Sequence, residues 1–146
     1  MRKKIELYKA YTQGQEKLTY YLIALAVAAI GFSVTRSAEL MLSIEQISLG
    51  IGVQFWAVSI FCGIRSIQYR LSHQQANLDL LRVEDGTHPE IVENPHHQGP
   101  AGEGILDAME EQAVNGNLCS AWQLRLFYLG ILAYLVWHVI QMYYNT

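Results

Sequence analysis

The sequence predicts an all-α, multi-pass membrane protein with three transmembrane helices and a cytoplasmic helical hairpin between helices two and three. Three observations carry this prediction. The chain has three long stretches without Asp, Glu, Lys or Arg, its basic residues flank these stretches unevenly, and the segment between the second and third stretch is amphipathic. Charged residues make up 16% of the chain, whereas soluble domains carry about 25%.

The first apolar stretch, residues 18–35, spans about 27 Å as an α-helix, which is close to the hydrocarbon thickness of a bilayer. Residues 46–64 and 124–144 are predicted to form the second and third transmembrane helices, because a soluble helix of this length carries charges on its outward face. Residues 36–45 are then a short outer loop. Residues 1–17 are expected to form a cytoplasmic amphipathic segment, which either lies along the membrane or extends the first helix.

Lysine and arginine residues set the predicted orientation. Five of them precede the first helix and three follow the second, whereas the loop between these two helices holds one, Arg36. Cytoplasmic loops of membrane proteins carry the excess of Lys and Arg. The N-terminus and the segment 65–123 are therefore expected in the cytoplasm, and the C-terminus on the opposite side of the membrane.

The segment 65–123 is predicted to fold as helix, loop and helix. Its first arm continues an apolar heptad seam from the second transmembrane helix, which is typical of a coiled-coil contact. The seam consists of Ile64, Ile67, Leu71, Gln74, Leu78 and Leu81. Gln74 is expected to specify register or oligomeric state, as buried polar residues do in coiled coils.

Two breaks are expected around the second arm of this hairpin. Residues 83–102 contain all three prolines and are predicted to form an irregular connector. Asn115, Gly116 and Asn117 are expected to interrupt the helix before the third transmembrane segment.

Small residues recur at helical spacing on the first two transmembrane helices. Such stripes let helix backbones approach closely inside a bilayer, so they are predicted to be packing faces toward this chain or another. They consist of Ala24, Ala28 and Gly31 on the first helix, and of Ser48, Gly52, Ser59 and Gly63 on the second.

His138 lies inside the apolar stretch ILAYLVWHVIQMYY, and Gln54 on the second helix lies at a comparable depth. Polar groups in transmembrane segments usually face the bundle and pair with one another. We therefore predict an intramembrane polar cluster of His138, Gln54 and Gln141. Two interpretations stay open: a neutral histidine that hydrogen-bonds across helices, and a ring of histidines in a conducting oligomer.

Signs of catalysis or metal binding are weak. His88, His96 and His97 are weak candidate metal ligands, together with Glu90 and Glu93, but they lack the ligand spacing of known zinc motifs. The sequence contains no catalytic triad arrangement, P-loop or dinucleotide fingerprint. We expect no enzyme activity, no cofactor and no metal.

The formal net charge of −3 and the acidic central segment argue against nucleic acid as a partner. The basic residues flank the apolar stretches, where they attract anionic lipid headgroups. The expected partners are the lipid bilayer and either a second copy of the chain or a larger membrane protein complex.

The segments LAVAAIGFSVT, QYRLSHQQANLDLLRVEDGTHPEI and WQLRLFYLGILAYLVWHVIQMYY resemble a set of small, uncharacterised, three-helix bacterial inner-membrane proteins. The resemblance covers most of the chain and implies a bacterial inner (plasma) membrane location, with the C-terminus in the periplasm. It implies no particular activity. In layout alone the chain is also similar to membrane effectors of bacterial nucleotide-signalling defence systems, although it has no nucleotide-binding motif.

Two functions follow as expectations. The first is a small integral membrane interaction or assembly protein, acting as an accessory subunit of a membrane complex or as a homo-oligomer. The alternative is an oligomeric effector that conducts ions or perturbs the membrane in bacterial defence. The first is preferred, because the polar residues of the three helices are too few to line a pore readily.

Overall fold

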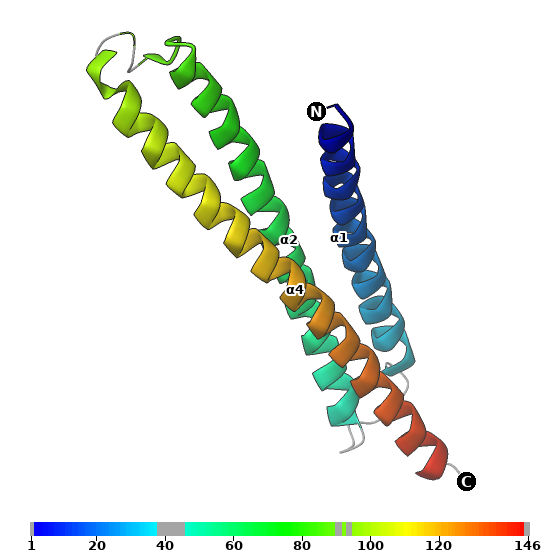
Figure 1. The fold of residues 1–146 in the computed structure, drawn as a ribbon. Helices are drawn as coiled ribbons and strands as arrows, with labels where there is room; N and C mark the ends of the chain where they lie inside the picture. The colour runs from blue at the N-terminus through cyan, green and yellow to red at the C-terminus, as the bar shows by residue number, and fades with distance from the viewer. Residues whose placement is uncertain (1, 38–45, 90–91, 93–94, 145–146) are drawn as a thin grey trace. The chain divides into compact units, whose positions relative to one another are not determined.

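The computed structural model describes residues 2–37, 46–89, 92 and 95–144, and these residues are mainly helical (Figure 1). The elements are α1 (Arg2–Ser37), α2 (Gln46–Glu84), the short 3-10 helix η1 (Pro95–His97) and α4 (Gln98–Tyr144). No β-strand occurs within these ranges. The prediction of an all-α fold is confirmed.

Three of these helices are long and apolar enough to cross a membrane, which confirms the three predicted apolar helices. The qualifying spans lie in Ala10–Ser37, Gln46–Glu84 and Gly99–Tyr143. Each span exceeds the roughly 20 residues that a bilayer requires. Most of the predicted outer loop, residues 38–45, lies outside the described residues.

Helix α1 runs without interruption through residues 2–17 into the apolar stretch that follows. The N-terminal segment is rich in Lys, Glu and Gln, which are good helix formers, and contains no proline. These residues therefore extend the first helix, one of the two arrangements expected for them.

Helix α4 is also continuous, so the predicted break at Asn115, Gly116 and Asn117 is wrong. Glycine and asparagine disfavour a helix by at most about 1 kcal/mol each, an amount that packing readily offsets. A Cβ atom at Gly116 would lie 3.3 Å from the Cβ of Tyr69, so the glycine lets α2 approach α4 closely. Gly116 is a packing residue rather than a helix end.

The irregular connector is shorter than the predicted 83–102, because α2 ends at Glu84 and α4 already begins at Gln98. Pro100 lies in the first turn of α4, where a missing N–H leaves no helical bond unmade. At the beginning of the connector, just after α2, Gly86 has a φ of 67° and its N–H donates to the Val83 carbonyl at 3.1 Å. This left-handed glycine ends α2.

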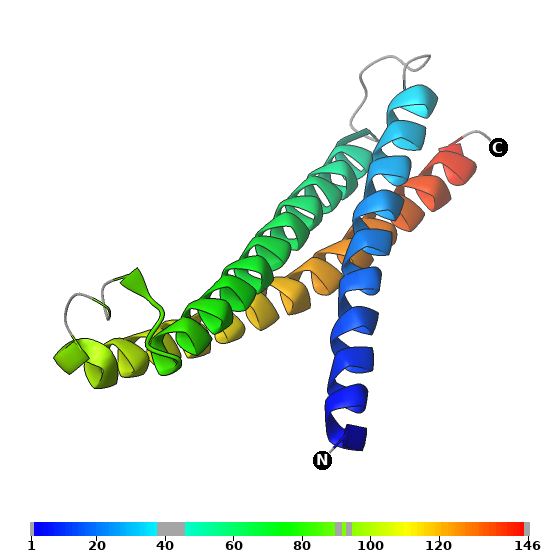
Figure 2. The same cartoon turned by 90° about the horizontal axis from the view of Figure 1, so that it is seen from above.

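The chain divides into two compact units. Unit 1 consists of Met1–Ile64 and Ser120–Thr146, and unit 2 of Arg65–Cys119. In unit 1, the end of α1, the beginning of α2 and the end of α4 come together in both views (Figures 1 and 2). In unit 2, α2 and α4 run antiparallel beside each other (Figure 2).

The interior of unit 1 is small and partly polar. Its buried apolar side chains are Leu22, Ala26, Leu49, Trp56 and Trp137, and its buried polar ones are Thr19, Ser33, Ser59 and Gln123. Many large apolar side chains of the three helices point outward instead. A surface of this kind is typical of helices surrounded by lipid.

Candidate functional site

Serine hydroxyls of α2 hydrogen-bond to the backbone of α4 in unit 1. Ser59 Oγ donates to the Gln123 carbonyl oxygen at 2.8 Å, and Ser48 Oγ donates to the Ala133 carbonyl oxygen at 3.0 Å. Such bonds form only where two helix backbones lie close together. Small side chains on α2 make this approach possible.

Two glycines complete the contact between α2 and α4 in unit 1. A Cβ atom at Gly52 would lie 3.2 Å from the Gly130 carbonyl oxygen, and one at Gly63 would lie 2.5 Å from Gln123 Nε2. No larger residue fits at Gly63 without moving the glutamine. The four small residues singled out on the second helix therefore all lie against α4.

Gln123 is the point where the three helices of unit 1 meet. Its side chain is fully buried, and its Nε2 donates to the Thr19 carbonyl oxygen on α1 at 3.2 Å. Its own backbone carbonyl accepts the Ser59 bond from α2. Its Oε1 is buried and has no hydrogen-bond partner among the described residues. An unpaired buried carbonyl of this kind costs about 1–3 kcal/mol.

Aromatic side chains gather around Tyr134 of α4. The ring centroids of Trp56, Trp137 and Phe32 lie 6.1, 5.5 and 6.4 Å from that of Tyr134. The imidazole of His138 stacks on the same ring at 6.4 Å, with an interplanar angle of 4°. His138 therefore lies beside an aromatic cluster.

The predicted polar cluster of His138, Gln54 and Gln141 is not joined by hydrogen bonds within the part of the chain that the structure describes. His138 and Gln54 are exposed, and Gln141 is half-buried. The polar cluster therefore stays a prediction.

Trp56 and Trp137 each bury an indole N–H that has no acceptor among the described residues. Trp56 is 3% exposed and lies directly against Gly130. The sequence alone did not single out either tryptophan, because both lie inside long apolar stretches in which no local pattern distinguishes a buried side chain from an exposed one.

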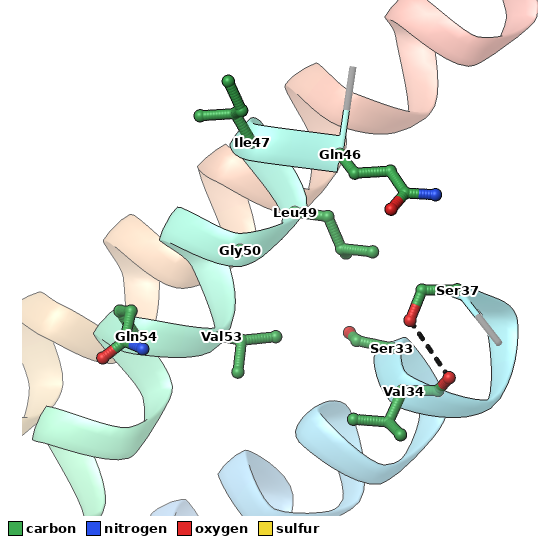
Figure 3. Close-up of a pocket in the computed structure, with 9 residues that line it drawn as sticks. All are labelled: Ser33, Val34, Ser37, Gln46, Ile47, Leu49, Gly50, Val53 and Gln54. Carbon is green, nitrogen blue, oxygen red and sulfur yellow. Dashed lines mark hydrogen bonds between the residues drawn. The ribbon is translucent and has the colours of Figure 1, made fainter. Parts of the chain in front are cut away.

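An open pocket of about 410 Å³ lies between α1 and α2 at one end of unit 1 (Figure 3). Its lining residues are Ser33, Val34, Ser37, Gln46, Ile47, Leu49, Gly50, Val53 and Gln54. The hydroxyl of Ser33 donates to the Ala29 carbonyl at 2.8 Å, and that of Ser37 donates to the Val34 carbonyl at 3.1 Å. These two hydroxyls bond their own helix, and the lining has no charge but includes the side-chain amides of Gln46 and Gln54.

In unit 2, α2 and α4 contact each other in antiparallel coiled-coil register. Ser66 Oγ donates to the Gly116 carbonyl oxygen at 3.0 Å. His73 Nδ1 lies 3.1 Å from the Met109 carbonyl oxygen, a bond that needs the proton on Nδ1. The step of seven residues from Ser66 to His73 is matched by an equal step from Gly116 back to Met109, as heptad packing requires.

The apolar seam predicted on α2 lies away from α4. Leu71, Leu78 and Leu81 are 55%, 57% and 50% exposed. Gln74 is also exposed, and Ile67 is half-buried. Ile64, the seam residue that belongs to unit 1, is likewise exposed. The contact with α4 uses Ser66 and His73 instead, so a partner for the seam stays a prediction.

The small-residue stripe of the first helix is uncovered as well. Ala24 and Ala28 are exposed, and a Cβ atom at Gly31 would meet nothing within 4 Å. The face of α1 that is buried carries Leu22 and Ala26 instead. The stripe is therefore free to face lipid or another chain.

The three connector histidines, His88, His96 and His97, lie within the described residues. Among the described residues, no group of three or more His, Cys, Asp or Glu side chains is placed to hold a metal ion. His96 and His97 are exposed, whereas Nδ1 of His88 is buried and has no hydrogen-bond partner within these residues. Glu90 and Glu93 lie outside the described residues.

No protein-family model, no curated protein and no solved structure matches this chain significantly. Its function has to be inferred from three features of the described residues. These are the close contact of α2 with α4, the buried Gln123, and the uncovered apolar face of α2.

Proposed function

We propose that this chain is an integral membrane protein that works by assembly, either as an accessory subunit of a membrane complex or as a homo-oligomer. The observation that carries the proposal is the uncovered leucine seam of α2 in unit 2. This stretch of α2 also carries five charged residues, namely Arg65, Arg70, Asp79, Arg82 and Glu84. Charges at this density keep a helix out of hydrocarbon, so its leucines need a protein partner rather than lipid.

The proposed location is the bacterial inner membrane. The three apolar helices support insertion, and the basic residues at the beginning of α1 and along α2 of unit 2 support a cytoplasmic N-terminus. Unit 2 is then cytoplasmic and the C-terminus periplasmic. In this arrangement the seam faces the aqueous side, where burial of apolar surface drives association.

Native mass spectrometry of the tagged chain, extracted gently from its own membrane, tests the proposal. We expect a defined homo-oligomer or a complex with a larger membrane protein. Replacing both Leu71 and Leu78 with serine is expected to release free chains, whereas the control Ala108→Ser, at an exposed position of α4, is expected to leave the assembly intact. Recovery of the wild-type chain as a monomer at all detergent concentrations would refute the proposal.

The second candidate function is a conducting oligomer, which the exposure of His138 and Gln54 on the single chain favours. A polar side chain that faces hydrocarbon is costly, so a neighbouring copy that covers it is favoured. This function predicts ion flux in liposomes that depends on pH and falls with His138→Leu. Val139→Leu, at the next exposed position, serves as the control. Wild-type liposomes without flux at any pH would count against it.

A further inference from the structure

We infer that the seam of α2 in unit 2 is covered by the same seam of a second copy, so that two α2 segments form a parallel coiled coil. The α2 face consists of Ile67, Leu71, Gln74, Leu78 and Leu81. This inference rests on the proposed function, because insertion into a membrane gives both copies the same direction.

The α2 face lies opposite the contact with α4. Ser66 and His73 hydrogen-bond to the α4 backbone. Leu71 lies two positions before His73 and Gln74 one position after it, which correspond to rotations of about 200° and 100°, so the centre of the face is turned well away from α4. A second helix can therefore pack on the α2 face while α4 keeps its contacts.

The chemistry of the face favours a copy of itself as the partner. Its four apolar residues surround one uncharged polar residue, Gln74. A glutamine side chain both donates and accepts hydrogen bonds, so two Gln74 amides can pair with each other across a symmetry axis. An apolar partner residue would leave that amide buried and unpaired, at a cost of about 1–3 kcal/mol.

The residues that flank the face are compatible with a parallel pair. In parallel heptad packing, Arg70 of one copy faces Gln75 of the other, and Asn77 faces Arg82. Neither pairing brings like charges together. The guanidinium of Arg82 is also 3.4 Å from the Asp79 carboxylate of its own helix, so its charge is already balanced.

Disulfide cross-linking in native membranes tests the inference. The two native cysteines are first replaced (Cys62→Ala and Cys119→Ala), and single cysteines are then introduced as Leu71→Cys, Gln74→Cys and Leu78→Cys. Each variant is expected to form a dimer with itself on oxidation, because corresponding residues of a parallel pair face each other at disulfide distance. The control Ala108→Cys, on an exposed part of α4, is expected to stay monomeric.

Several results would overturn the inference. Cross-linking of the Gln74→Cys variant with itself, while the Leu71→Cys and Leu78→Cys variants form a dimer only when the two are co-expressed, would mean an antiparallel pair. Equal cross-linking of Ala108→Cys would mean random collision. Absence of cross-links in chains that native mass spectrometry finds assembled would leave the proposed assembly function standing and reject this face. A wild-type chain that is monomeric and free of partners would reject both.

Gln74→Leu provides an independent readout. A single polar residue in a coiled-coil core selects register and copy number at some expense of stability. The variant is therefore expected to remain assembled but to lose its single defined copy number. An unchanged copy number would show that Gln74 does not select the assembly.

Discussion

Replacing Gly130 with alanine adds one methyl group where α4 lies directly against α2. The new Cβ would fall 2.6 Å from Cδ1 and 2.9 Å from Cε2 of the Trp56 indole. That ring is 3% exposed and lies beside the ring of Tyr134, so it has little room to move. Overpacking of this kind typically destabilises a protein by about 1–3 kcal/mol.

Gly31→Ala is the matched control, because it makes the same substitution inside a helix at a site with no neighbour within 4 Å. Alanine stabilises a helix by about 0.5–1 kcal/mol relative to glycine. The two variants are therefore expected to shift the free energy of unfolding in opposite directions. Thermal unfolding in detergent, followed by circular dichroism, measures both. A Gly130→Ala variant at least as stable as Gly31→Ala would refute the close contact between α2 and α4.

Three further predictions concern unit 1 and the membrane orientation. Ser59→Ala removes a buried interhelical hydrogen bond and is expected to lower the free energy of unfolding by about 0.6 kcal/mol. The control Thr35→Ala, at an exposed position, should change this free energy less. Denaturant titration of both variants measures the difference. Gln123→Leu keeps the side-chain volume and removes both the unpaired Oε1 and the bond to Thr19. It should therefore destabilise the protein less than Gln123→Ala, which leaves a cavity and should cost about 2–5 kcal/mol. A larger loss of stability for the leucine variant in the same titration would contradict this. Epitope tags at the two ends of the chain should differ in protease protection in inverted membrane vesicles, the N-terminal tag being cleaved; cleavage of both tags or of neither would contradict an odd number of crossings.

The three apolar helices could be predicted from the sequence, because the absence of charges over a bilayer-length stretch is a property of the chain itself. The continuity of α4 could not. Asn115, Gly116 and Asn117 resemble a turn when only local preference is considered. Their helical conformation depends on α2, whose Ser66 and Tyr69 pack against the glycine.

The spacing of small residues along a helix does not show which of them face a neighbouring helix. The stripes of α1 and α2 look alike in sequence, yet Gly63 lies against Gln123 while Gly31 has no neighbour within 4 Å. Gln123 itself was expected only as the last residue of the predicted cytoplasmic segment 65–123. Its burial arises from the meeting of three helices, which no local pattern encodes.

Where α2 meets α4, large side chains of one helix lie against glycines of the other, and this arrangement sets the alignment of the two helices. Serine bonds to carbonyl oxygens do not distinguish one turn of α4 from another, since every turn offers the same acceptor. The fit of Gln123 against Gly63 and of Trp56 against Gly130 does distinguish them. A slip by one heptad in one direction would place Trp56 against Gln123, which overfills that layer, and a slip in the other direction would place Gly63 against Gly130, which leaves a hole. The pairing of two bulky side chains with two glycines therefore fixes the position of α2 along α4.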